Sequence, residues 1–457
     1  MPAPRRHLAV CIVLSTLLAG CGGDPDPIAS RAPRLRARAR GAWTELPPMA
    51  AARLYPVAVP LDGGRALVTG GVAVDGSAND VAVIYDPDGG ASPWTESLVI
   101  DPARDDVPYQ TAFHYLTRLR DGRVLLFGGL ASAFLGDQRA YLFDPGTSTW
   151  RRTADDLPSP FGGGIGVNAV LLRDGNVFAA GGYAPNFPAA NGAATLYEVE
   201  ADHWVGDLEP LPRAVAHNAL IALDDGRVLV VGGGGGPGGQ NGFDDASIDC
   251  PTATEANAPC PNAQIYDPAT GHWRAADHQM PGIPGEEVAT DPRKEGGRQW
   301  PIVLPLKHGL VLVAGGTTIN TSAGAGKGRT SALVFDPSSE TWTVVGALHE
   351  VKSEASTFVS ERNGTPLLLP AFDESCNGDR RSERFDQESM SFTVLDGLFP
   401  TDGEEFPCAP GTPGPAVNLF GTSAAMLSDG RALLVGGQDP NVFVPSARAF
   451  IYVPPQQ

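Results

Sequence analysis

Six pairs of adjacent glycines recur along the chain, and each pair directly follows a short apolar run. A tight turn precedes each run, as Asp121-Gly122 precedes RVLLF and Asp225-Gly226 precedes RVLVV. Asp-Gly favours two-residue β-hairpins, because the backbone of such turns needs positive φ. The glycine pairs are Gly70-Gly71, Gly128-Gly129, Gly181-Gly182, Gly232-Gly233, Gly315-Gly316 and Gly436-Gly437, and a seventh copy around Leu369-Pro370 has lost its glycines. The pattern predicts seven repeated units, each beginning with a hairpin of two strands, a and b.

An aromatic strand and a tryptophan mark the second half of each unit. Strand c ends in an aromatic residue and Asp-Pro, as in VIYDP up to Pro87 and LVFDP up to Pro337. A short polar turn then leads to strand d. Its markers are Trp94, Trp150, Trp204, Trp273, Trp342 and, in the degenerate sixth unit, Phe392. The chain also contains 56 Gly and 42 Pro, which argues against long helices and for short strands joined by tight turns. Each unit is therefore expected to form four strands.

These units resemble Kelch repeats, and residues 43–457 are similar to the propeller of the galactose oxidase family. The resemblance implies an all-β fold, a seven-bladed Kelch-type β-propeller. The repeat region begins with a strand d at Trp43 and ends with a strand c near Tyr452, so the last unit lacks its own strand d. We expect the N-terminal strand d to complete the C-terminal blade, which closes the ring and removes exposed strand edges.

The first residues read as a targeting segment. Arg5 and Arg6 precede an apolar stretch, residues 8–18, that is too short to span a bilayer. The sequence Leu-Ala-Gly before Cys21 resembles the lipobox of bacterial lipoproteins, which implies that residues 1–20 are removed and Cys21 is lipidated. Residues 21–42 are predicted to form a flexible Arg-rich tether, which either contacts anionic lipid headgroups or stays solvated. We therefore expect an exported protein, lipid-anchored to the cell envelope at the outer membrane.

The formal net charge is −19, with 52 acidic and 33 basic residues. Nucleic-acid binding needs clustered Lys and Arg for phosphate contacts, so this charge argues against a nucleic-acid partner. The acidic surface favours solubility, and we expect a monomer.

Four cysteines remain after Cys11 leaves with the signal and Cys21 takes the lipid. An even number in an exported protein indicates disulfides. Cys250 and Cys260 lie in one b–c loop, whereas Cys376 and Cys408 lie on adjacent blades at the same face. We predict that each of these pairs forms a disulfide that braces a long loop.

The two faces of the predicted propeller differ in loop length. Strands alternate in direction, so b–c loops and d–a linkers open on one face, and a–b and c–d turns on the other. The long segments are all b–c or d–a: residues 234–263, 278–299, 317–330, 371–382 and 396–417. Long loops on a rigid scaffold often carry function. The candidate binding residues on this long-loop face are Tyr109, His114, Glu286, Glu287, Arg298, Trp300, Asp373 and Glu404.

The leading functional hypothesis is a non-catalytic binding scaffold whose long-loop face takes a protein or glycan partner. Tyr109 and Trp300 offer rings that can stack on a sugar or anchor a partner, with core packing as the alternative for each. We predict no cofactor, and the acidic loops leave Ca²⁺ open as an alternative.

Two enzymatic alternatives remain open. A carbohydrate isomerase or lyase would need residues such as Glu286, Glu287, Arg298, His114 and Glu404 to converge at the channel mouth. An oxidase like galactose oxidase would need copper ligands that include an adjacent Tyr-His pair, and the chain has only the reversed order, His114-Tyr115.

Overall fold

The computed structural model describes residues 41–455, apart from 133–134, 160–163, 165, 184–189, 207, 235–261, 285, 287–297, 321–324, 350–357, 371–380, 401–417 and 439–443. Within these residues the regular secondary structure is almost entirely β-strand, with short 3-10 turns such as η2 (Asp62–Gly64) and η6 (Lys307–Gly309). No helix of the described part is long and apolar enough to cross a membrane.

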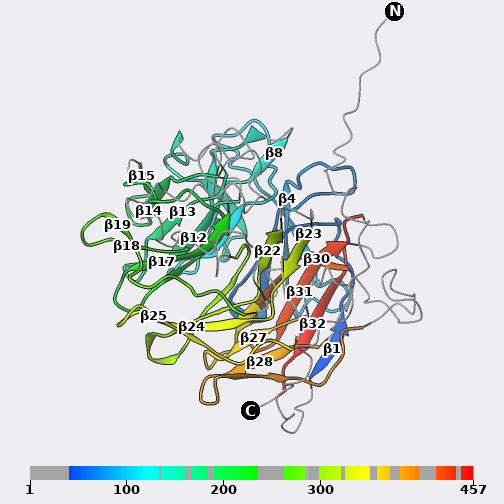
Figure 1. Cartoon of the computed structure of the whole chain (residues 1–457). Coiled ribbons are helices and arrows are strands. Elements are labelled where there is room, and N and C mark those ends of the chain that lie inside the picture. The colour runs from blue at the N-terminus through cyan, green and yellow to red at the C-terminus, as the bar shows by residue number, and fades with distance from the viewer. Residues whose placement is uncertain are drawn as a thin grey trace, which may run out of the picture.

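Seven four-stranded antiparallel sheets make up the fold (Figure 1). We refer to them as blades one to seven in chain order. Each blade is given from its innermost to its outermost strand. Blade one is β2 (Val57–Pro60), β3 (Ala66–Thr69), β4 (Val81–Tyr85), β5 (Trp94–Leu98); blade two is β6 (Tyr115–Arg118), β7 (Val124–Phe127), β10 (Ala140–Asp144), β11 (Thr149–Arg152); blade three is β12 (Asn168–Leu171), β13 (Val177–Ala180), β14 (Ala194–Glu198), β15 (His203–Val205); and blade four is β16 (Ala216–Ala222), β17 (Val228–Gly234), β18 (Ala263–Asp267), β19 (His272–Ala275). Blade five is β20 (Ile302–Pro305), β21 (Val311–Ala314), β24 (Ala332–Asp336), β25 (Thr341–Val344); blade six is β26 (Phe358–Ser360), β27 (Pro366–Leu368), β28 (Glu383–Asp386), β29 (Ser391–Val394); and blade seven is β30 (Asn418–Met426), β31 (Ala432–Gln438), β32 (Ala449–Val453), β1 (Ala42–Glu45). Two small hairpins extend b–c loops: β8 (Leu130–Ser132) with β9 (Leu135–Gly136), and β22 (Thr317–Asn320) with β23 (Ala325–Gly328).

The innermost strands form a closed ring. β2 contacts β6, and the contacts continue through β12, β16, β20 and β26 to β30, which returns to β2. The predicted seven-bladed β-propeller is therefore confirmed.

The N-terminal strand closes the seventh blade, as the repeat pattern predicts. β1 pairs antiparallel with β32, and Trp43 lies opposite Tyr452 (Figure 1, where blue β1 lies beside red β32). The Trp43 ring also packs edge-on against Phe399, at 4.9 Å between centroids. The two ends of the repeat region thus share one sheet.

The hydrophobic core is divided into seven wedges, one between each pair of adjacent blades. The first wedge, for example, joins Leu67 and Ile84 of blade one to Leu126 and Tyr141 of blade two. A central strand is covered on both faces, which is why each strand b reads as a continuous apolar run rather than an alternating one.

The glycine pairs exist because neighbouring blades approach closely at the end of strand b. Gly70 and Gly71 have φ of 55° and 93°, in the left-handed region. The Gly71 N–H donates to the Thr111 carbonyl of the next blade at 2.9 Å. A Cβ on Gly70 would lie 2.4 Å from the ring of His114. The same inter-blade hydrogen bond recurs from Gly129, Gly182, Gly233 and Gly437.

The tryptophans of strand d also connect blades. The Trp94 indole N–H donates to the Pro47 carbonyl, which follows β1 of the seventh blade, at 2.7 Å. Trp273 donates in the same way to the Glu209 carbonyl, and Trp342 to the His278 carbonyl. The repeated tryptophan therefore fastens each of these outer strands to the preceding blade.

Candidate functional site

A residue with left-handed backbone lies just before or within the innermost strand in six of the blades. Its spacing to the first glycine of the blade is the same each time. These residues and their φ values are Tyr55 (58°), Phe113 (57°), Gly166 (59°), His217 (59°), Trp300 (48°) and Gly421 (66°). They follow the d–a linkers, so they surround the propeller axis on the face that carries the linkers and b–c loops, which we call the upper face.

Four of these residues carry aromatic rings, and together with the buried Tyr183 they form a row of neighbouring rings. The rings of Tyr55 and Phe113 lie 4.8 Å apart, and Phe113 packs against the apolar cluster that contains Tyr183. The rings of Tyr183 and His217 lie 5.2 Å apart, and His217 stacks on Trp300 at 3.9 Å. We call Tyr55, Phe113, Tyr183, His217 and Trp300 the aromatic arc.

Gly166 makes room for the middle of the arc. A Cβ on Gly166 would lie 3.4 Å from the ring of Tyr183, so this ring occupies the space that a larger left-handed residue would take. Tyr183 directly follows the glycine pair of the third blade. The arc therefore runs unbroken from the first blade to the fifth.

Hydrogen bonds fix the orientation of His217. The Tyr183 hydroxyl lies 2.5 Å from Nε2, and the Gln299 Oε1 lies 3.4 Å from Nδ1. Burial raises the pKa of Tyr183, so the phenol stays protonated and donates to Nε2. The Nδ1–H then donates to Gln299. Burial also lowers the pKa of His217 to about 3, so the ring in the arc is neutral.

The residue that follows each left-handed position lies against the glycine of the preceding blade. His114 packs on Gly70 and its Nε2 is 2.7 Å from the Thr69 hydroxyl. Asn218 packs on Gly181 in the same way. Burial and the nearby Arg53 lower the pKa of His114 to about 3. His114, predicted as a binding residue, thus lies in the wedge between the first two blades.

Two other predicted residues, Arg298 and Glu286, are brought close together. The buried Arg298 guanidinium donates to the Ser331 carbonyl at 3.2 Å and to the Ser331 hydroxyl at 3.1 Å. The Glu286 carboxylate accepts from the Ser331 hydroxyl at 2.6 Å and from Arg329 at 3.1 Å. These bonds connect Ser331, which precedes β24, to the linker residues Glu286 and Arg298.

Tyr109 lies in the core rather than at the surface. Its side chain is fully buried, and its hydroxyl donates to the Gly128 carbonyl at 2.6 Å. The guanidinium of Arg139 lies over its ring, 5.3 Å from the centroid. This placement corresponds to the core-packing alternative.

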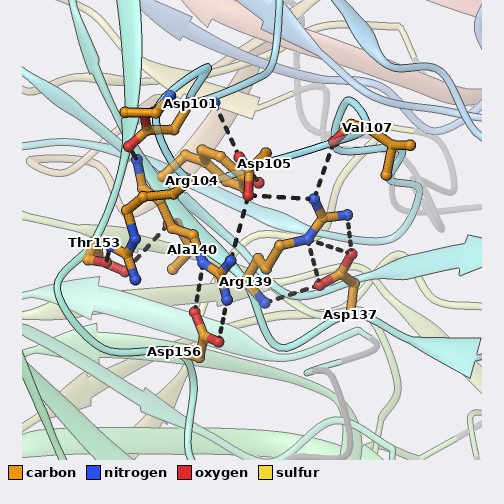
Figure 2. A network of polar contacts seen from close by, with 12 residues as sticks. Asp101, Arg104, Asp105, Val107, Asp137, Arg139, Ala140, Thr153 and Asp156 are labelled. Carbon is orange, nitrogen blue, oxygen red and sulfur yellow. Dashed lines mark hydrogen bonds and ion pairs between the residues drawn. The ribbon is translucent and has the colours of Figure 1, made fainter.

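The linker that carries Tyr109 is held by a polar network on the upper face (Figure 2). The Asp105 carboxylate accepts from the Tyr141 hydroxyl and lies 3.3 Å from Arg152 and 3.7 Å from Arg139. Burial opposes ionisation, but the Asp101 amide, the Tyr141 phenol and the two arginines outweigh it and lower the pKa of Asp105. The linker is therefore tied to the second blade by a buried charge.

The remaining predicted site residues lie outside the described part of the chain. They are Glu287, Asp373, Glu404, the lipidation residue Cys21 and the disulfide residues Cys250, Cys260, Cys376 and Cys408. Of the five predicted residues that are described, only Trp300 belongs to the arc. The sequence analysis did not select Tyr55, Phe113, Tyr183 or His217. The constant spacing to the glycine pair was the available signal.

The comparisons with known proteins agree with the fold. No family model matches the chain, and no curated protein is similar to it in sequence. Among solved structures it is similar to a fungal alcohol oxidase of the AA5 family in complex with copper, with a TM-score of 0.58 and 16% sequence identity. The match covers 92% of this chain and 77% of the oxidase. At this identity the similarity establishes the seven-bladed β-propeller with a galactose oxidase-like neighbour.

This comparison corrects the prediction on cofactors. We predicted none, with Ca²⁺ as the alternative, and the neighbouring propeller is a copper complex. A propeller of this shape therefore holds a metal cofactor in another protein.

The described residues of this chain do not by themselves fit copper. Nowhere in the described ranges do three or more His, Cys, Asp or Glu side chains gather as metal ligands. His114 is engaged by Thr69 within a wedge, and His217 is held between Tyr183 and Gln299. No chemical step through copper can be built on these residues.

Proposed function

We propose that the protein binds a glycan on its upper face, and that the aromatic arc is the surface on which sugar rings stack. The observation that carries the proposal is the choice of bulky residues where the backbone is left-handed. Tyr55, Phe113, His217 and Trp300 all have φ between 48° and 59°.

Glycine would satisfy the backbone at these positions without strain, as Gly166 and Gly421 do. A non-glycine residue held in this region costs about 1–3 kcal/mol, and such strain is concentrated at functional sites. Four aromatic side chains kept at this cost, and packed into one surface, support a role for the rings beyond satisfying the turn.

Aromatic rings suit a sugar ligand because they present a flat apolar face, and tyrosine, tryptophan and histidine add polar edges. Four arc residues, Tyr55, Tyr183, His217 and Trp300, have such polar edges, and Phe113 is a phenyl ring. A protein partner would need a contact area of about 800 Å² on each side, whereas the five arc side chains are all partly or fully buried. The glycan is therefore the better-supported of the two partners.

The scaffold also suits binding. The closed ring of innermost strands holds the backbone of the arc residues in place, and long loops on such a rigid scaffold often carry function. We further propose that the repeats are of the Kelch type.

We also propose that the protein is an exported lipoprotein held at the outer membrane through Cys21. Incorporation of labelled fatty acid into the chain, lost in Cys21→Ser, tests the anchor.

A second candidate is oxidation of an alcohol or sugar, which the similarity to the AA5 alcohol oxidase favours. Oxygen consumption is measured for the full chain with and without added copper, over a panel of alcohols and sugars. Copper-dependent turnover would establish this candidate, and its absence with every substrate would remove it.

Glycan binding is tested by titrating the full chain with neutral and acidic oligosaccharides of several linkages and measuring binding heats. We expect micromolar to millimolar binding of at least one glycan. If no glycan binds while an envelope protein binds directly in purified form, the protein-partner hypothesis replaces this one.

A further inference from the structure

Two buried arginines flank the ends of the aromatic arc. Arg53 lies two positions before Tyr55, and Arg298 two positions before Trp300. Both side chains are fully buried, at 0% exposure. The repeat thus places one arginine two residues before the first residue of the arc and one two residues before the last.

Their hydrogen-bond acceptors are neutral. Arg53 donates to the Gly70 carbonyl at 2.8 Å and the Val81 carbonyl at 2.5 Å. Arg298 donates to the Gly315 carbonyl at 3.1 Å and to both Ser331 oxygens. Within the described residues neither guanidinium forms an ion pair, and the Nε of each lacks a partner.

Both arginines remain charged at neutral pH. Burial lowers the pKa of Arg53 to about 10 and that of Arg298 to about 9, so each is still protonated at pH 7. Glu96 and Asp80 offset part of the Arg53 charge without pairing with it, and Glu286, near Arg298, is bonded to Arg329. Salt screens buried charges less than exposed ones, so the charges of both guanidinium groups act on nearby groups even in salt.

This local field contrasts with the molecule as a whole. The chain carries a formal net charge of −19, which repels anions at long range. A preference for an anionic ligand therefore cannot come from the overall charge and has to come from groups beside the site.

We infer that the ligand of the aromatic arc is an acidic glycan, one that carries carboxylates such as those of uronic acids. The inference rests on the proposed glycan binding and adds the ligand's charge. The sugar rings stack on the arc, and their carboxylates lie in the field of Arg53 and Arg298. Neither arginine touches the ligand, so both act as electrostatic, specificity-determining residues.

The direct test compares ligands that differ only in charge. The full chain is titrated with oligosaccharides of galacturonate, glucuronate and mannuronate, each beside its complete methyl ester and a neutral hexose oligomer. We expect at least one acid to bind about tenfold more tightly than its ester, with the gap shrinking as salt is added. Equal or tighter binding of the esters overturns the inference and leaves glycan binding standing. No binding of any acid, ester or neutral sugar overturns both.

Variants of the two arginines test whether the preference for acidic over esterified sugars comes from the buried charges. Arg53→Gln keeps a donor for the carbonyls but removes the charge, and Arg298→Gln does the same at the other end. Each is expected to lower acid affinity several-fold while ester affinity stays constant. The matched control is Arg118→Gln, which removes one positive charge from an exposed pair with Asp62 on the opposite face. An acid–ester gap that survives in both arc variants, or falls equally in the control, contradicts the inference.

Discussion

The two faces of the propeller both contain left-handed residues, and they use them differently. On the face of the a–b and c–d turns, which we call the lower face, most a–b turns have glycine, such as Gly122, Gly226 and Gly430. The c–d turns there include Asp202 and Glu340, whose carboxylates pair with Arg151 and Arg227 at 2.6 Å. On the upper face the corresponding non-glycine residues are aromatic and contact one another.

This difference separates structural from functional strain. A charged left-handed residue on the lower face fastens its turn to a neighbouring blade, so the fold itself explains it. The backbones of the upper-face residues also bond neighbouring blades: the Tyr55 N–H donates to the Gly421 carbonyl and the Trp300 N–H to the His217 carbonyl, both at 2.8 Å. Ring assembly therefore explains left-handed backbone on both faces, and we attribute to ligand binding only the choice of aromatic side chains in place of glycine on the upper face.

The largest expected effect compares one glycine from each face. A Cβ on Gly129 would lie 2.2 Å from the Thr111 hydroxyl and 2.5 Å from the Ala112 carbonyl, whereas one on Gly226 would meet open space. Both residues have positive φ, so both substitutions strain the backbone. Gly129→Ala should lower the free energy of unfolding by about 4 kcal/mol and Gly226→Ala by about 1 kcal/mol. Denaturant unfolding measures both, and equal losses would show that blade contact is not what the upper glycines serve.

The second comparison is between a buried and an exposed carboxylate. The Asp105 side chain is 1% exposed and faces two arginines, whereas the Asp62 side chain is 77% exposed and faces Arg118. Asp105→Asn removes the buried anion and leaves Arg139 and Arg152 only their second partners, Asp137 and Asp156, so we expect a loss of about 3 kcal/mol. Asp62→Asn should leave the unfolding midpoint nearly unchanged. A large loss of stability in Asp62→Asn would contradict the expectation that an exposed ion pair on the lower face contributes little.

The pH dependence of stability should distinguish the two faces, because their titrating groups act in different pH ranges. His114 and His217 have folded pKa values of about 3 against 6.5, so the unfolded chain binds protons first as pH falls. Stability should therefore decline from pH 6.5 downward, by up to about 1.4 kcal/mol per pH unit for each histidine.

Glu340 on the lower face affects stability at lower pH than the histidines do. Hydrogen bonding to Arg274 lowers its pKa to about 2 from 4.5, despite burial, so its contribution is present above pH 4.5 and is lost towards pH 2. Denaturation midpoints across pH check both windows. His114→Gln should flatten the first window and leave the second, and a profile flat from pH 6.5 to 4.5 would refute the burial of neutral histidines.

Most of the fold could be predicted from the repeated glycine pairs, turns and tryptophans, because each answers a backbone requirement that recurs in every blade. Even the closing strand at Trp43 follows from counting strands. The arc could not, because the left-handed positions accept unlike residues: Tyr55 and Trp300 are aromatic, whereas the same position of the third blade is Gly166. His114 and Arg298 were predicted near the mouth from their place in the linkers. Both lie within two residues of a left-handed residue, and their side chains face the interior. His114 packs into the wedge against Gly70, and Arg298 bonds the Gly315 carbonyl at the end of strand b.

The central claim is that the aromatic ring of Trp300, rather than the shape of its turn, binds the ligand. Trp300→Gly tests it, because glycine adopts the φ of 48° without strain and removes only the ring. The control is Trp94→Ala, which removes a half-buried tryptophan from the rim. With the best glycan from the panel, calorimetry should show an affinity loss of about tenfold or more in Trp300→Gly and none in Trp94→Ala, with both variants folded. Unchanged affinity in a folded Trp300→Gly protein would contradict the account.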